Sequence, residues 1–283
     1  MKKNAFLALA ILSSTCITQA QQSSSFKDNL SFGISYGIAK PQGKFGNNHF
    51  SFLSPSNLGA FSEGETSDLS LADFLDNSFA KQGNEISVFA EYFKDDHFGA
   101  FIQWGQSEFD LYQGELKSLE LLANEIIQDQ SPLIPPLSMN VTQWKSNTIV
   151  LGPTLRQQYN KFSVQVKAAI GLLFLESPEF TVGLDQILGI PLPIPVNVMS
   201  LPQENTTSSI YTLGLSTQYE LYEKTHIQIG MEYSKSKVTM EDVAIQLIPD
   251  FIDLDIPDEL LEPVEFDVDY QTLNFKLGLI RNL

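Results

Sequence analysis

Apolar and polar side chains alternate along most of this chain, and this period of two restricts the fold more than any other feature of the sequence. In 162–174 every even-numbered residue is apolar, whereas Ser163 and Lys167 lie on the odd-numbered face. Such alternation is typical of β-strands with one apolar face. It predicts eight strands and an all-β fold, with strands at 30–39, 85–94, 98–110, 144–158, 162–174, 211–221, 227–234 and 273–279.

The connections between these strands alternate between short and long. All prolines except Pro153 fall in the long connections, as expected where strands end. An even number of strands with short turns on one side and long loops on the other predicts an antiparallel up-and-down transmembrane β-barrel. The short turns lie at 95–97, 159–161 and 222–224, and the long loops at 40–83, 111–143, 175–206 and 241–267.

The first twenty residues have the layout of a secretory signal peptide. Lys2 and Lys3 precede an apolar run at 5–12, and small residues surround Ala20, after which we expect cleavage. A lipoprotein with an acylated Cys16 is the alternative, but Ser13 stands where that motif requires leucine. The expected organisation is a signal peptide at 1–20, a short periplasmic segment at 21–28 and a barrel at 29–283.

The chain resembles the eight-stranded outer-membrane β-barrel superfamily, which includes the OmpA transmembrane domain, OmpX and the PorT-like barrels of Bacteroidetes. Near the C-terminus, Lys276, Leu277 and Gly278 match part of the family's assembly signal, but Arg281 and Leu283 stand where aromatic residues are expected. The resemblance implies Sec export, location in the cell outer membrane in contact with its lipid, and loops that face outward. The alternative is a soluble, lipocalin-like barrel that binds an apolar ligand.

Charge is distributed unevenly over the chain. The net charge of −17 excludes nucleic acid as a partner, because phosphate binding requires a basic surface. Most acidic residues fall in the long loops, whereas the charged residues of the strands alternate inward, where we expect them to pair in a filled lumen rather than line a pore. Glu232 and Lys276 should lie at a similar height and pair. The predicted lumen network comprises Glu91, Glu220, Glu232, Arg156, Lys167 and Lys276, with Glu85 on the same face.

The long loops are both acidic and apolar. Leu119, Leu122 and Ile126 recur at helical spacing, and 184–188 is expected to form one helical turn, so the loops should carry short helices. Their apolar residues either form a cap over the barrel or a docking surface for an extracellular or outer-membrane protein partner. The predicted apolar loop surface comprises Leu133, Ile134, Leu192, Ile194, Phe251 and Ile252.

Few residues suggest catalysis or metal binding, and we expect no cofactor and no enzymatic activity. His49 is the one histidine predicted near the outer leaflet, so a lipid A-modifying enzyme of the same fold is the alternative function. Clustered carboxylates suit calcium, although the spacing in the last loop lacks the usual order of ligands. The calcium candidates are Asp250, Asp253, Asp255 and Asp258.

Overall fold

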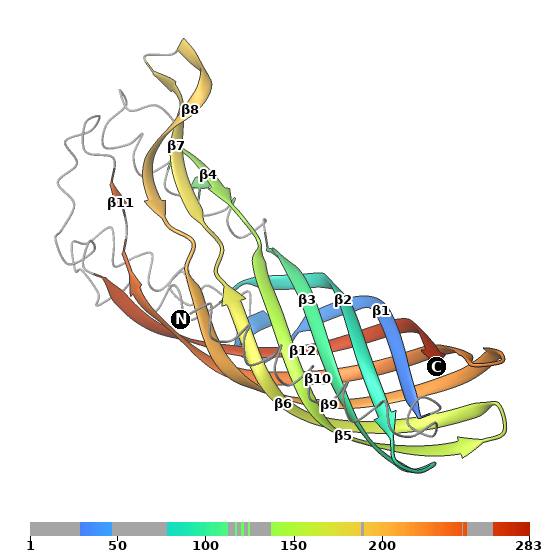
Figure 1. The fold of residues 1–283 in the computed structure, drawn as a ribbon. Coiled ribbons are helices and arrows are strands. Elements are labelled where there is room, and N and C mark those ends of the chain that lie inside the picture. Colours follow the sequence, from blue (N-terminus) through green and yellow to red (C-terminus); the bar gives the residue numbers. More distant parts are fainter. Residues whose placement is uncertain are drawn as a thin grey trace.

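A computed structural model describes residues 29–46, 78–112, 117, 120–121, 124, 137–187, 190–244, 246–247 and 263–283. The predicted signal peptide and the segment at 21–28 lie outside these residues. Eight strands form one closed barrel (Figure 1), as the alternation predicts. The barrel strands are β1 (Leu30–Pro41), β2 (Ala80–Phe93), β3 (Phe98–Leu111), β5 (Trp144–Tyr159), β6 (Phe162–Glu176), β9 (Asn205–Tyr222), β10 (Thr225–Val243) and β12 (Val264–Asn282).

Every neighbouring pair in the barrel is antiparallel, in the order β1-β12-β10-β9-β6-β5-β3-β2. The seam joins the first and last barrel strands, from Ser31 opposite Asn282 to Pro41 opposite Thr272. Closure gives every barrel strand two neighbours and leaves no unpaired edge.

Short turns connect β2 to β3, β5 to β6 and β9 to β10, as predicted. Asn160 and Lys224 have φ angles of 52° and 66°, the left-handed conformation that tight hairpin turns require. In the first turn, Asp95 Oδ1 accepts hydrogen bonds from the backbone N–H groups of Phe98 and His97, at 2.7 and 2.8 Å. These bonds favour the carboxylate and lower the pKa of Asp95.

We call the part of the barrel next to the short turns the turn-end section. Here the outward side chains are apolar and exposed, whereas most inward ones are small, polar or charged, with the buried rings of Phe89, Phe93 and Phe101 among them. The polar face of the alternation therefore lines the lumen, which is the opposite of the lipocalin-like alternative. The outward residues of this section include Ile34, Tyr36, Ile102, Val166, Leu213, Leu215, Ile229, Met231, Phe275, Leu277 and Leu279.

Toward the long loops the polarity of the two faces reverses, and we call this part the loop-end section. On β12 the outward positions become Asp269 and Asp267, while Tyr270 and Val268 are buried inside. On β10 the buried side chain of Val238 lies next to the exposed Lys237. Lys237 Nζ pairs with Asp267 Oδ2 at 2.5 Å on the outer surface. The barrel is therefore apolar-out at one end and apolar-in at the other.

The loop-end section continues into a second sheet, in the order β11-β8-β7-β4 (Figure 1). Its strands are β4 (Leu137–Val141), β7 (Phe180–Ile187), β8 (Ile190–Leu201) and β11 (Gln246–Leu247). The helical turn predicted at 184–188 is wrong, because 184–187 belong to β7. Pro191, Pro193 and Pro195 lie within β8, where β11 pairs only with Met199 and Ser200, so this stretch tolerates residues that lack an N–H donor.

Helical structure is sparse among the described residues. A 3₁₀ helix, η1 (Gly43–Gly46), follows β1. In the next long loop Lys117, Glu120, Leu121 and Asn124 are helical, whereas Leu119, Leu122 and Ile126 lie outside the described residues. Within the part of the chain that the structure describes, no helix has the length and apolar character needed to cross a membrane.

Candidate functional site

Buried ion pairs occupy the lumen of the turn-end section. Lys276 Nζ lies 2.6 Å from Glu85 Oε1 and 3.0 Å from Glu232 Oε2, so the predicted contact between Glu232 and Lys276 is present. Lys167 forms a second ion pair with Glu91, and both side chains are buried. We call these five residues the lumen network. It holds three carboxylates against two ammonium groups.

Glycines give these long side chains their space. Gly37 stands in register between Lys276 on β12 and Glu85 on β2, so the two charged groups meet across a strand without a side chain. Gly214 stands in the same way between Glu232 on β10 and Lys167 on β6. The alternation of glycine with charged residues thus lets the side chains of six neighbouring strands fill a narrow lumen.

Neutral groups complete the lumen network. Gln103 Nε2 donates to Glu232 Oε1 at 3.0 Å, and Gln165 Nε2 donates to Glu91 Oε2 at 3.4 Å. Lys167 Nζ lies 4.6 and 5.0 Å from the ring centres of Phe89 and Phe101, within reach of cation–π attraction. A cavity of about 20 Å³ between the two ion-pair clusters has room for about one water molecule.

The structure does not bring all the predicted lumen residues together. Arg156 lies near the short turns, where its Cζ stacks 3.8 Å from the ring centre of Phe93. Among the described residues, neither Arg156 nor Glu220 forms an ion pair. Arg156 is opposite Gln165 in the ladder and attracts Glu91 of the lumen network from beyond ion-pair distance.

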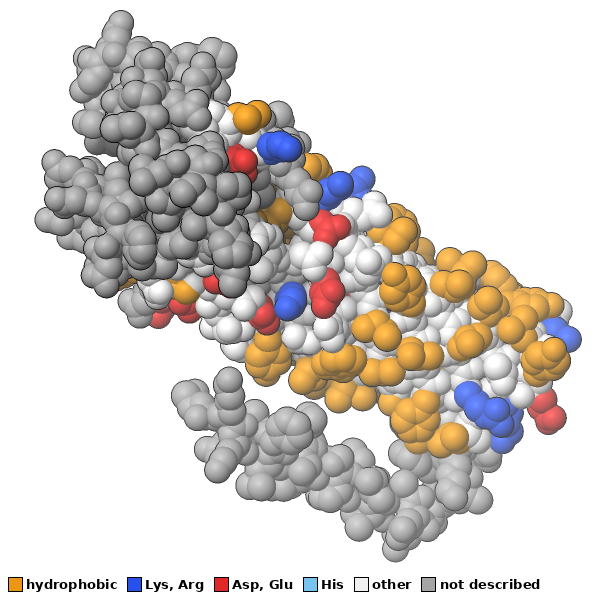
Figure 2. All heavy atoms as spheres, turned by 90° about the horizontal axis from the view of Figure 1, so that it is seen from above, with side chains coloured by type: hydrophobic (Ala, Val, Ile, Leu, Met, Phe, Trp, Pro, Cys, Tyr) orange, Lys and Arg blue, Asp and Glu red, His pale blue; other side chains and the backbone are white. Residues whose placement is uncertain are grey.

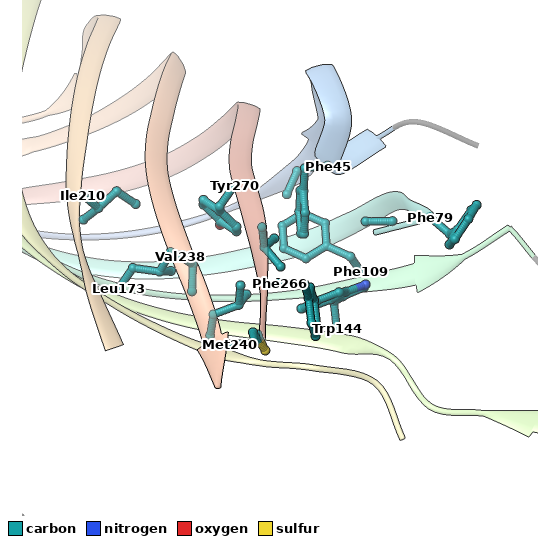
Figure 3. Packing of buried hydrophobic residues seen from close by; sticks show 14 of the residues in the cluster. Phe45, Phe79, Phe109, Trp144, Leu173, Ile210, Val238, Met240, Phe266 and Tyr270 are labelled. Carbon is teal, nitrogen blue, oxygen red and sulfur yellow. The ribbon is translucent and has the colours of Figure 1, made fainter. Parts of the chain in front are cut away.

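An aromatic cluster fills the loop-end section of the interior (Figure 3). The ring of Phe45, carried inward by η1, lies 5.3 Å from Phe109, 5.7 Å from Trp144 and 4.9 Å from Tyr270 between ring centres. The polar atoms of these rings have partners: Trp144 Nε1 donates to Ser78 O at 2.7 Å, and the Tyr270 hydroxyl lies 3.1 Å from Ser146 Oγ.

This aromatic cluster was not predicted from the sequence. The signal exists, because Val264, Phe266, Val268 and Tyr270 alternate with acidic residues as a strand with one buried face would. The loop predicted at 241–267 therefore extends too far, because β12 begins at Val264 and Phe266, Val268 and Tyr270 are buried inside the barrel.

The loop end of the molecule holds an open cavity beside the second sheet. It has a volume of about 440 Å³, and β3, β4 and the helical residues Lys117 and Glu120 line it. Glu120 Oε2 accepts a hydrogen bond from Met139 N at 3.2 Å, so the helical residues approach the edge strand β4. Leu192 and Ile194 lie in β8. Other predicted surface and calcium residues lie outside the described residues: Leu133, Ile134, Phe251, Ile252, Asp250, Asp253, Asp255 and Asp258.

Metal binding finds no further support in the part of the chain described. No three His, Cys, Asp or Glu side chains gather there in a way that could hold an ion. His49, the residue on which the enzymatic alternative depends, lies outside the described residues.

The outer surface defines the class of protein. Hydrophobic side chains cover the turn-end section, whereas charged side chains gather beside the loop end (Figure 2). A closed eight-stranded barrel with an apolar outer surface and a polar lumen is the architecture of a transmembrane β-barrel.

Solved structures of outer-membrane proteins are similar to this chain in fold. Neisserial surface protein A is 9% identical, with 90% of this chain and 97% of that chain covered at a TM-score of 0.40. Ail of Yersinia pestis is 12% identical over 89% and 96%, at 0.40. OprG of Pseudomonas aeruginosa is 11% identical over 92% and 100%, at 0.38. No protein-family model and no curated protein matches the chain.

Proposed function

We propose that this protein is a non-porin barrel of the outer membrane, without enzymatic activity, that binds a protein partner at the cell surface through its loop-end structure. The observation that carries this proposal is the division of the barrel. The interior is filled at both ends, by the lumen network and by the aromatic cluster, while the strands continue beyond the apolar outer surface into a second sheet.

Filling of the interior argues against transport. A solute would have to pass Lys276 and Lys167, which are buried among their carboxylate partners, and then the rings of Phe45 and Tyr270. Eight strands enclose a lumen just wide enough for side chains to fill, so the barrel serves as a support.

Partner binding has its support at the loop end. The hairpin of β7 and β8 adds eight and twelve residues of strand beyond β6 and β9, a length that anchoring alone does not require. The sheet ends in the short edge strands β4 and β11, and such edges accept strands from a partner. The cavity of about 440 Å³ lies beside one of these edges.

Orientation and transport are tested first. A single cysteine is placed at Asn197 in β8 or at Asp96 in the first short turn, and intact cells are treated with a membrane-impermeant maleimide. We expect Asn197→Cys to react in intact cells and Asp96→Cys to react only after lysis. The purified protein should give no conductance steps in a planar bilayer. Reaction of Asp96→Cys in intact cells would reverse the orientation, and regular steps would exclude the non-porin function.

Partner binding is tested by photo-crosslinking in intact cells. A photoreactive amino acid at Asn197 should give discrete adducts of higher mass, whereas the same residue at Tyr222, in the third short turn, serves as the control. Replacing 180–201 by a short glycine-containing turn should abolish the adducts while β6 and β9 still pair and the barrel still folds. A folded protein that gives no adduct from Asn197 would contradict the proposal.

A further inference from the structure

A polar cavity lies at the turn end of the barrel, on the opposite side of the lumen network from the second sheet. Its volume is about 110 Å³. The side chains around it include Arg156, Lys161 and His226, and none of the described residues that line it is an Asp or Glu. In a chain with twice as many acidic as basic residues, this is a local reversal of charge.

Arg156 is held in place without a direct ion pair among the described residues, although the carboxylates of Glu91 and Asp96 attract its guanidinium from a longer distance. Its guanidinium stacks on Phe93, and its Nε donates to the backbone oxygen of Asp96 at 3.4 Å. Stacking fixes the plane of the guanidinium, and its Nη groups can then donate two parallel hydrogen bonds to an oxyanion.

Two buried polar atoms at the cavity have no partner among the described residues. Gln218 is only 5% exposed; its Oε1 accepts from Ser163 Oγ at 3.5 Å, but its Nε2 has no acceptor. His226 Nδ1 is also buried without a partner. Both residues line the cavity. A buried donor without an acceptor is unfavourable, so a ligand oxygen placed here would relieve that cost.

We propose that this cavity binds a phosphate group through Arg156, Lys161 and Gln218, with His226 as a further donor. The volume accommodates a phosphate together with water, and the donors belong to β5, the adjoining turn, β9 and β10, so they surround the cavity from several sides. Glu220 is the nearest acidic neighbour of His226 along the inward face, but it does not line the cavity. The phosphate is either a free ion or the headgroup of a phospholipid.

The test uses the purified full-length protein in an uncharged detergent that contains no phosphorus. Inorganic phosphate is titrated and followed by phosphorus NMR at constant ionic strength. We expect saturable line broadening that Arg156→Gln weakens at least about tenfold, since one charge-assisted contact is lost. Gln218→Met should weaken binding as well while leaving the barrel folded, because it removes the unused Nε2 donor and, of the contacts within the fold, only the long hydrogen bond from Ser163 Oγ to Oε1.

Arg281→Gln is the matched control, because Arg281 is exposed on the outer surface at the same end of the barrel. It removes the same charge and should leave phosphate binding unchanged. Folding of each variant is checked by its resistance to urea. The proposal is overturned if broadening does not saturate, if folded Arg156→Gln binds like the wild type, or if Arg281→Gln loses as much affinity as Arg156→Gln.

The source of the phosphate group is then distinguished by competition. A short-chain phosphatidylglycerol is added below its micelle concentration to protein saturated with inorganic phosphate. Displacement of the ion through the same residues assigns the cavity to a lipid headgroup. Lack of displacement, with binding still dependent on Arg156 and Gln218, assigns it to the free ion.

Discussion

The two sections of the barrel interior are filled by side chains of opposite polarity. In the turn-end section the outer surface is apolar, so the interior holds the polar groups, and the lumen network satisfies charge with charge. In the loop-end section the outer surface carries Lys237 and Asp267, and the interior holds aromatic rings as a water-soluble barrel does. The same strands therefore face lipid along the turn-end section and water along the loop-end section. The reversal of polarity marks the boundary between the two.

The largest effect on stability should come from the lumen network in the turn-end section. Lys276→Met removes the shared partner of Glu85 and Glu232 and leaves two buried carboxylates facing each other. We expect the free energy of unfolding to fall by about 4 kcal/mol, measured by urea titration in lipid vesicles with tryptophan fluorescence. Lys235→Met, on the outer surface, is the control. Adding Glu85→Gln and Glu232→Gln to Lys276→Met should restore most of the loss, and failure to do so would show that packing rather than charge is responsible.

The stability of the loop-end section should depend on how well the volume of the aromatic cluster is filled, and not on charge. Phe45→Ala leaves a cavity among Phe109, Trp144 and Tyr270 and should lower the free energy of unfolding by about 3 kcal/mol. Phe45→Leu should cost about 1 kcal/mol, because it keeps most of the apolar volume. The same urea titration measures both. Equal losses for the two variants would mean that the ring contacts, and not the filled volume, stabilise this section.

Conductance distinguishes which of the two sections closes the lumen. Because the two sections fill the interior independently, Phe45→Ala alone should produce no conductance in a planar bilayer. A conducting Phe45→Ala protein would place the whole barrier in the aromatic cluster and leave none in the lumen network.

The smallest effects should come from the exposed charges. Lys237→Ala breaks the pair with Asp267 on the outer surface and should change stability by no more than the error of the measurement, because exposed pairs contribute little. A large loss would indicate that the outer surface at this height is not exposed to water.

Asp95 should give a weak pH dependence. Its pKa is lowered by the N–H groups of Phe98 and His97, so the stabilisation exists above the pKa of the unfolded chain and disappears as the pH falls through the folded value. Lowering the pH from about 5 to about 3 should therefore destabilise the wild type slightly more than Asp95→Asn. Urea midpoints at the two pH values provide the measurement, and identical shifts for both proteins would contradict the expectation.

The sequence predicted the turn-end section well because there the alternation has a single meaning. Strand number, the short turns, the inward face and the contact between Glu232 and Lys276 all follow from a period of two with a fixed polarity. The loop-end section was missed for the same reason. On the N-terminal side of Gln271 in β12 the period continues, but the polar and apolar faces exchange places, so the predicted loop at 241–267 includes 264–267, which belong to β12.

One other error came from a local signal that tertiary structure overrides, and two features had no local signal. Prolines at 191, 193 and 195 predicted an irregular segment, yet β8 accommodates them where few ladder bonds are needed. The role of Phe45 depends on η1 turning its ring back into the barrel, and nothing in the short sequence around it marks that return. The cavity at the turn end combines residues from several strands that no local motif connects.

The seam between β1 and β12 has a consequence for how the barrel forms. Ser31 and Asn282, which are hydrogen-bonded at this seam, are 251 positions apart, so closure brings together the most distant segments of the ring. Contacts of such long range carry the largest entropic cost and form late. Until β12 docks, an assembling chain would present an unpaired β1 on one side and an unpaired β10 on the other, and these open edges are the sites at which a folding catalyst or an aggregating neighbour would compete with the native strand.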